Sequence, residues 1–300
     1  MKRLHSERGQ AAVLTVVFLA GLLGAMAMVL DVGSWFREQR ATQSAADAAA
    51  LAGAQELPEF PGSASAVASE YLTSNGGGAA AISFSTRNYP NDTISVDVTR
   101  KAPGVFAKLF GINSVDVHAH AKARTGNPDS ARYAAPIAVD RQHPLLNCTP
   151  LPCFGQDTVL DLKKTGPGAF RLLNLDGSKG GTGGKIDAEW ILRGFDGYMP
   201  LGWYGSDPGA AFNDSKIKEA LDIRIGDELL FPIYDSVQSN GANFEYRVIG
   251  WVGFVVTGFQ SNGNKGLVNG QFVRVIWEGM LSESGSGAED FGVRSVELVE

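Results

Sequence analysis

The sequence predicts an α+β protein that begins with a long transmembrane helix, continues into a small α+β unit and ends in a β-rich domain. Three patterns predict this order: an uncharged apolar run at residues 11–30, mixed helix and strand patterns at 58–125, and mostly strand patterns at 133–300. A hydrophobic content of 44% and a charged content of 19% are typical of folded rather than disordered chains.

The apolar run Ala11–Leu30 contains no charge and no proline. As an α-helix it would be about 30 Å long, which matches the thickness of a bilayer core. Trp35 and Phe36 follow it and suit the aromatic belt at a membrane surface. Positive charges precede it at Met1, Lys2, Arg3 and Arg8. This asymmetry predicts a cytoplasmic head at residues 1–10 and an extracytoplasmic position for the rest of the chain.

Two other interpretations of this run are a cleaved signal peptide and a core helix of a soluble domain. A cleaved signal peptide would use Ala25-Met26-Ala27 as its small-x-small cleavage site, but Met28-Val29-Leu30 prolongs the apolar run beyond that site. A core helix of a soluble domain would show a polar face, and this run shows none. A retained single-pass anchor is therefore preferred.

The helix is expected to continue beyond the membrane, so that span and extension together cover residues 11–57, because no proline occurs before Pro58. Side chains from Ser44 to Ala54 are almost all small, which allows another helix to approach closely. Two interpretations stay open: packing against the helix's own domain, or contact with another protein.

In the small unit at residues 58–125, we expect a helix at Ser63–Asn75 with Ser63 as its N-cap. Strands are expected at Ile82–Arg87, Thr93–Arg100 and Val115–Ala123, where apolar and polar residues alternate. Pro103–Phe110 is predicted to be a short amphipathic helix with its apolar side chains inward: Val105, Phe106, Leu109 and Phe110.

A domain boundary is expected at residues 126–132, a polar stretch that breaks the periodicity. The β-rich domain at 133–300 is predicted to hold two helices, at Ile186–Gly194 and Asp214–Leu221. Its predicted strands are Ala135–Val139, Thr158–Leu162, Phe170–Leu175, Glu228–Asp235, Phe244–Phe259 and Leu267–Met280.

Cys148 and Cys153 are the only cysteines, and they lie in the proline-flanked stretch NCTPLPCF. In an oxidising compartment a disulfide is the natural interpretation. Two reduced thiols or half of a metal site are the alternatives, but a C-x4-C pair without a second pair of ligands is weak evidence for zinc.

The other candidate sites do not match known catalytic, cofactor-binding or metal-binding patterns, so no enzyme activity, cofactor or metal is predicted. GSKGGTGGK at 177–185 departs from a phosphate-binding loop, with Lys179 in the first glycine position and Ile186 in the hydroxyl position. His118 and His120 alternate with apolar residues and are interpreted as part of a polar outer strand face.

The net charge of −6 argues against nucleic-acid binding, which needs a basic surface. The acidic excess lies in the β-rich domain, since the chain has 12 basic and 11 acidic residues up to Arg132 but 14 and 21 after it.

The N-terminal segment resembles the Tad (Flp-type) pilus-assembly proteins of the TadE/TadG-like kind. The resemblance rests on ERGQAAV, the apolar span, LDVG at 30–33 and ATQSAADAAALAGAQEL at 41–57. Residues 92–124 are also similar to that group. The resemblance implies a bacterial cell-envelope protein with its helix in the inner membrane, a pilin-like small unit outside, and partners among other pilus-assembly proteins.

Some relatives are pseudopilins that a prepilin peptidase cuts after a glycine ahead of the span, and Gly9–Gln10 is the position that fits this pattern. Type IV prepilins place a glutamate at the fifth residue of the mature chain, where this sequence has Leu14. This departure favours an uncut anchor.

Asp31 and Gly33 form the candidate membrane-boundary motif. Two interpretations of Asp31 stay open: helix registry or pairing with a partner's cation, and a hydrated carboxylate that marks the end of the span.

The predicted function is therefore a single-pass membrane protein of a Tad/Flp-type pilus-assembly system with a structural or assembly role. The alternatives are an exported module that binds a surface ligand or an ion, and, ranked lower, an exported hydrolase.

Overall fold

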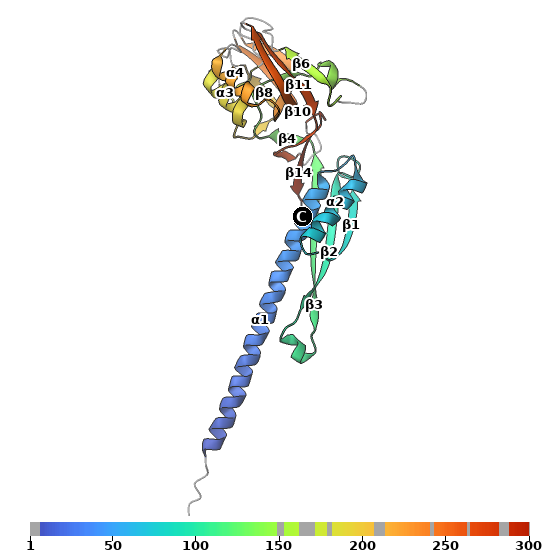
Figure 1. The fold of residues 1–300 in the computed structure, drawn as a ribbon, viewed down its shortest axis with the longest axis vertical. Coiled ribbons are helices and arrows are strands. Elements are labelled where there is room, and N and C mark those ends of the chain that lie inside the picture. Colours follow the sequence, from blue (N-terminus) through green and yellow to red (C-terminus); the bar gives the residue numbers. More distant parts are fainter. Residues whose placement is uncertain are drawn as a thin grey trace, which may run out of the picture. The chain divides into compact units, whose positions relative to one another are not determined.

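A computed structural model describes residues 7–148, 153–161, 172–178, 182–206, 214–240, 243–262, 265–281 and 288–299. The chain forms two compact units (Figure 1). Unit 1 comprises the described residues up to Arg124 together with Leu298 and Val299, and unit 2 comprises the described part of Thr125–Glu297. The predicted α+β class, with a long N-terminal helix and a strand-rich C-terminal region, is confirmed.

Helix α1 (Glu7–Ala54) has 48 residues and dominates unit 1. At 1.5 Å per residue it is about 72 Å long, more than twice the thickness of a bilayer core. Figure 1 shows it as one continuous helix whose N-terminal half extends beyond the rest of the unit. The side chains of residues 11–23 are all exposed, so nothing in the described part of unit 1 covers this part of the apolar run.

The rest of unit 1 is a helix and a meander of three antiparallel strands. Helix α2 (Pro61–Ser74) is followed by β1 (Ala79–Ser85), β2 (Thr93–Pro103) and β3 (Ser114–Gly126). Strand β2 pairs with both neighbours, and the sheet order is β1-β2-β3. The C-terminal Val299 returns to this unit, where its N–H donates to the carbonyl of Lys122 at 2.9 Å.

The N-terminus of α2 differs from the prediction, since Phe60 occupies the N-cap position and Pro61 the first turn. Ser63 is therefore not the N-cap. Proline suits the first turn of a helix because its missing N–H would have no partner there, so it can begin the helix without a capping side chain.

The C-terminal part of α1 packs against its own unit. The buried alanines of α1 face α2 and β2: Ala45, Ala46, Ala49, Ala50, Ala52 and Ala54. On α2, residues four apart complete this contact: Ala64, Ala68 and Leu72. A Cβ on Gly53 would lie 2.6 Å from Cδ1 of Ile94 and 2.9 Å from the carbonyl oxygen of Ala64. The small residues of 44–54 therefore serve close packing within unit 1, the first of the two interpretations left open by the sequence.

The turn between β1 and β2 is organised by Asp92, which is fully buried. Its carboxylate accepts hydrogen bonds from the backbone N–H groups of Arg87 (2.9 Å), Asn88 (2.6 Å) and Tyr89 (2.9 Å). Burial raises the pKa of this carboxyl, but the three backbone hydrogen bonds together outweigh burial, so its pKa lies below the ordinary value of 3.8.

Unit 2 is built on a six-stranded, mainly antiparallel sheet with the path β5-β9-β10-β11-β6, in which β8 also pairs with β10. The strands are β5 (Val139–Asp140), β6 (Asp157–Asp161), β8 (Gly202–Gly205), β9 (Glu228–Asn240), β10 (Asn243–Asn262) and β11 (Lys265–Val273). Its aromatic core includes Phe231, Phe254 and Phe272 on one side and Tyr246 and Trp251 on the other.

Smaller elements complete unit 2. They are the strands β4 (Pro128–Ala131), β7 (Met199–Pro200), β12 (Val275–Ile276), β13 (Gly279–Leu281) and β14 (Val293–Leu298), the 3-10 helix η2 (Pro144–Leu146), and helices α3 (Gly184–Arg193) and α4 (Ser215–Ile223). Helices α3 and α4 pack against each other, and Asp214 caps α4 by accepting from the N–H of Lys216.

Several expected elements of unit 2 differ in the structure. Residues 126–132, where a domain boundary was expected, contain the end of β3 and all of β4, and the two compact units divide between Arg124 and Thr125. The expected strand Leu267–Met280 is divided into β11, β12 and β13. Within Ala135–Val139 only the first residue of β5 and one isolated bridge, at Ile137, form. Part of the expected strand Phe170–Leu175 lies outside the described residues.

Two glycines of α1 provide a matched test of the close packing. Gly53→Ala should lower the unfolding free energy by about 1–3 kcal/mol, because the new methyl group meets Ile94 and the backbone of Ala64. Gly33→Ala should raise helix stability by about 0.5–1 kcal/mol, because nothing lies within 4 Å of its Cβ position. Thermal unfolding in detergent micelles, followed by circular dichroism, measures both; equal effects of the two substitutions would contradict this packing.

Asp92→Asn should destabilise unit 1 by about 1–3 kcal/mol at neutral pH, because the amide cannot serve three backbone donors as the carboxylate does. Since the folded pKa is lowered, the carboxylate stabilises the fold above about pH 4 and this stabilisation is lost as the pH falls through the folded pKa. The stability difference between wild type and variant, measured by denaturant titration, should shrink at acidic pH. A pH-independent difference would refute the role of the charge.

Candidate functional site

Four polar side chains of α1 are spaced four residues apart and lie on one face of the helix: Asp31, Trp35, Gln39 and Gln43. Each of them hydrogen-bonds to the backbone of the β2–β3 hairpin. We call these residues the polar stripe. It lies immediately after the apolar run and connects α1 to the β2–β3 hairpin, whose end lines a groove together with Met28 of that run.

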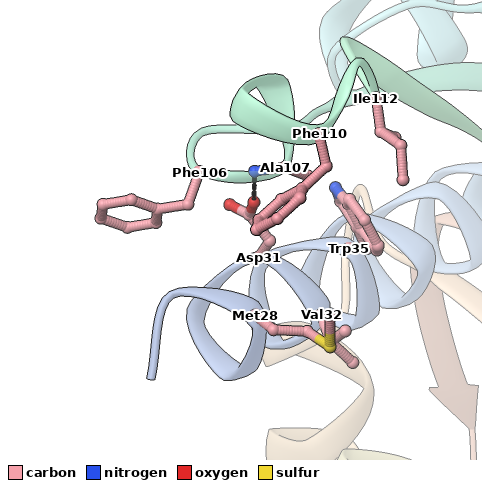
Figure 2. A pocket seen from close by; sticks show the side chains of 8 residues that line it. All are labelled: Met28, Asp31, Val32, Trp35, Phe106, Ala107, Phe110 and Ile112. Atoms are coloured by element: carbon pink, nitrogen blue, oxygen red, sulfur yellow. Dashed lines mark hydrogen bonds between the residues drawn. The ribbon is translucent and has the colours of Figure 1, made fainter. Parts of the chain in front are cut away.

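Asp31 begins the polar stripe, and only 2% of it is exposed. Its carboxylate accepts hydrogen bonds from the backbone N–H of Val105, at 2.9 Å, and from that of Ala107 (Figure 2). Both donors belong to the irregular segment between β2 and β3. One negative charge therefore satisfies backbone donors that would otherwise lie next to an apolar helix without a partner.

The other members of the polar stripe donate to carbonyl oxygens. Nε1 of Trp35 donates to Pro103 at 3.1 Å. Nε2 of Gln39 donates to His118, and Nε2 of Gln43 donates to His120 at 2.8 Å. Because the two histidines are two residues apart, their carbonyls point to the same edge of β3, and the glutamines of α1 cover that edge.

A groove of about 180 Å³ lies between α1 and the end of the hairpin. It is lined by Met28, Asp31, Val32, Trp35, Phe106, Ala107, Phe110 and Ile112. Figure 2 shows the side chains of Trp35, Phe110 and Ile112 between the helix and the hairpin, whereas the ring of Phe106 lies to the left of them. Apart from Asp31 the groove is lined by apolar side chains, so its chemistry suits hydrocarbon rather than an ionic or polar ligand.

The prediction of an amphipathic helix at Pro103–Phe110 is wrong. Strand β2 continues to Pro103, and the helical part is the single 3-10 turn η1 (Ala107–Phe110). The side chains expected to point inward are exposed, with Leu109 at 83% and Phe110 at 70%. A segment this short at the end of a two-stranded hairpin has no core beneath it in which to bury four large side chains.

The structure gives Asp31 a role that neither interpretation from the sequence included. Its carboxylate binds the chain's own backbone, while Gly33 lies on the open side of α1 with nothing within 4 Å of its Cβ position. Sequence reasoning missed Gln39 and Gln43 and interpreted Trp35 as an interfacial aromatic residue. The four-residue spacing from Asp31 to Gln43 was a signal that could have revealed the polar stripe.

Gly9 and Gln10 both lie within α1, and the side chain of Gln10 is exposed. Cleavage between them stays a prediction.

Cys148 and Cys153 form a disulfide with their Cα atoms 6.0 Å apart, and the N–H of Cys153 donates to the carbonyl of Leu145 at 2.9 Å. The pair lies in unit 2, apart from the residues of the polar stripe. That it is oxidised in the cell stays a prediction.

The side chains of His118 and His120 lie opposite Thr99 and Asp97 on β2. Nδ1 of His118 is 2.9 Å from Oγ1 of Thr99, and Nδ1 of His120 is 2.7 Å from Oδ1 of Asp97. These are cross-strand pairs on an exposed face.

In the glycine-rich segment 177–185, residues 179–181 lie outside the described part, and Gly184 and Lys185 begin α3. Among the described residues, no group of three or more His, Cys, Asp or Glu side chains could hold a metal ion.

Comparison with known proteins identifies the segment that contains the polar stripe. Residues 9–56 match the model of the family described as "Putative Flp pilus-assembly TadE/G-like". Searches of curated proteins and of solved structures found no match. Within the described residues one helix, Gln10–Ala54, is long and apolar enough to cross a membrane, and none of its most apolar 18-residue window is buried.

Asp31→Asn should release the end of the hairpin, because an amide group cannot replace both oxygen acceptors. The backbone N–H groups of Val105 and Ala107 should then exchange with solvent roughly tenfold faster, as measured by hydrogen–deuterium exchange. Gln43→Ala is the matched control: it removes the contact to His120 and should leave the exchange at Val105 and Ala107 unchanged. Equal exchange in wild type and Asp31→Asn would show that the carboxylate does not hold this segment.

Proposed function

We propose that this chain, a pilus-related membrane protein whose residues 9–56 are TadE/G-like, is a single-pass component of a Tad/Flp-type pilus-assembly system. Its head lies in the cytoplasm, residues 11–30 cross the membrane, and the rest of unit 1 and all of unit 2 work outside it. Its role is structural or in assembly, not enzymatic.

The observation that carries this proposal is that one helix combines the family match with a lipid-compatible surface. The match at residues 9–56 covers nearly all of α1, including the exposed apolar run and the buried alanines. An apolar helix of this length without any cover would be unstable in water, whereas a bilayer supplies the missing cover.

Two features support the proposed orientation. Basic residues precede the span at Lys2, Arg3 and Arg8, as expected for a cytoplasmic end. In unit 2 the disulfide between Cys148 and Cys153 suits an oxidising compartment outside the cytoplasm.

The packing of α1 restricts where partners can bind along it. Its alanine-rich part is buried in unit 1, so other pilus-assembly proteins would meet the helix within the bilayer. Gly21 and Gly24 lie in the apolar run at residues 11–30, and nothing lies within 4 Å of either Cβ position. Glycines at such positions let the backbones of two transmembrane helices approach closely.

Deletion of the protein from its cell should abolish surface pili, and wild type should restore them. Gly21→Leu combined with Gly24→Leu should leave the protein anchored but reduce piliation severalfold, because the larger side chains keep partner helices apart. Met26→Leu combined with Val29→Leu is the control and should restore pili fully, because both side chains are exposed and neither lines the groove beside the hairpin. Pilus counts by electron microscopy, with membrane fractionation of each variant, give the readout.

Protease treatment of spheroplasts tests the orientation in the same cells. A tag placed before Met1 should stay protected while the segment after Asp31 is digested. Normal pili in the deletion strain would refute the assembly role, and digestion of the N-terminal tag in intact spheroplasts would refute the orientation.

A further inference from the structure

The segment between β2 and β3, residues 104–113, exposes large apolar side chains on both sides of η1. We call it the hairpin tip. Its exposed apolar residues are Val105, Phe106, Leu109, Phe110 and Ile112. Lys108 is the only charged residue in the hairpin tip. An exposed apolar cluster of this kind in a folded protein marks an interaction surface, because water would be a poor solvent for it.

The polar stripe places the hairpin tip at the outer end of the membrane span. Asp31 directly follows the apolar run and binds the N–H groups of Val105 and Ala107. Met28 and Val32, from the last turn of the run and the next turn, line one groove together with Phe110. Figure 1 shows η1 beside the middle of α1, at the far end of the hairpin from α2.

We propose that the hairpin tip inserts into the outer leaflet of the bilayer that α1 crosses and forms a second membrane contact. Its partner is the phospholipid interface: the apolar side chains enter the boundary between headgroups and acyl chains. The inference rests on the proposed anchoring by α1, and it adds a contact that a single-pass anchor does not require.

The backbone of the hairpin tip is arranged for an environment poor in water. Besides the two donors bound by Asp31, the N–H groups of Gly104, Leu109, Gly111 and Ile112 donate to carbonyls within the tip. Their acceptors are Asn113, Phe106, Lys108 and Ala107, at 2.9–3.1 Å. Because unsatisfied backbone groups cost several kcal/mol in hydrocarbon, internal pairing of this kind is what an inserted loop needs.

The charge of Lys108 is compatible with a position of the hairpin tip at the lipid headgroups. Lys108 is exposed, and its long side chain can bury its methylene groups while the ammonium reaches lipid phosphates. A second attachment point beside α1 would restrict the tilt and rotation of the helix, which interfacial anchors normally set. Unit 1 would then keep a defined orientation to the membrane surface.

Site-specific fluorescence in proteoliposomes tests the insertion with the full chain. The polarity-sensitive probe NBD is attached to Leu109→Cys, with Cys148 and Cys153 kept as a disulfide. The vesicles contain phosphatidylethanolamine and phosphatidylglycerol. Leu19→Cys, about 18 Å along the helix from Asp31, reports on the bilayer interior. Ser83→Cys, exposed on β1, reports on water.

Insertion predicts that the Leu109 probe is shielded from aqueous iodide and is quenched severalfold more by headgroup-proximal than by deep spin-labelled lipids. This pattern corresponds to a depth of about 5–10 Å. The Leu19 probe should show the reverse lipid preference, and the Ser83 probe should be quenched by iodide alone.

The controls separate failure of this inference from failure of the proposed anchoring. Iodide quenching at Leu109 together with lipid quenching at Leu19 overturns insertion and leaves the anchor intact. Iodide quenching at both positions overturns both. Shielding of Leu109 that disappears when the protein is diluted with lipid means that a second copy covers the tip, which also overturns the inference.

The NBD probe is itself apolar and could cause insertion when it replaces Leu109. A second experiment therefore moves the probe away from the apolar side chains that are tested. The probe is moved to Asn113→Cys, and Leu109→Gln with Phe110→Gln should then raise its iodide quenching severalfold. Both side chains are exposed, so the fold should persist. Phe60→Gln, also exposed but near the start of α2, is the matched control and should change nothing. Unchanged quenching in the double variant would overturn the inference.

Discussion

The hydrogen bonds that the Asp31 carboxylate accepts hold the end of the β2–β3 hairpin on α1, and the arrangement of unit 1 depends on them. This carboxylate lies where the apolar run ends, and it accepts hydrogen bonds from backbone N–H groups of a segment more than 70 residues further along the chain. Together with Trp35, Gln39 and Gln43 it attaches the β2–β3 hairpin to α1 through backbone atoms. Backbone recognition leaves the side chains of the hairpin tip free to face outward.

The two parts of helix α1 have surfaces that suit different surroundings. In its first part the side chains are apolar and uncovered, as a lipid environment requires. In its last part the side chains are small and buried, and Gly53 allows α2 and Ile94 to approach closely. The polar stripe lies between these parts. This division allows one uninterrupted helix to combine an exposed apolar surface of membrane length with a packed structural core.

Sequence patterns were most reliable where one physical requirement dominated. The long helix followed from an uninterrupted apolar run and the absence of proline, and the three strands of unit 1 followed from alternating apolar and polar residues. These elements and the two helices expected in unit 2 are present. The hairpin tip was mispredicted because its apolar spacing was taken as a sign of burial. Apolar spacing reports only that side chains avoid water, and a membrane surface satisfies that requirement as well as a protein core does.

The sequence by itself determined that the chain has a membrane-length apolar helix, a TadE/G-like segment and two cysteines close enough to pair, because each depends on local composition or spacing. Only the tertiary structure decided which surface the small residues serve, what Asp31 binds, and that the apolar residues at 105–112 face outward. These outcomes depend on contacts between α1 and the β2–β3 hairpin. The residues that meet there are far apart in the chain. The four-residue spacing marks the polar stripe on α1, but three of its four contacts are to backbone carbonyls of the hairpin, whose positions depend on the fold and not on side-chain identity.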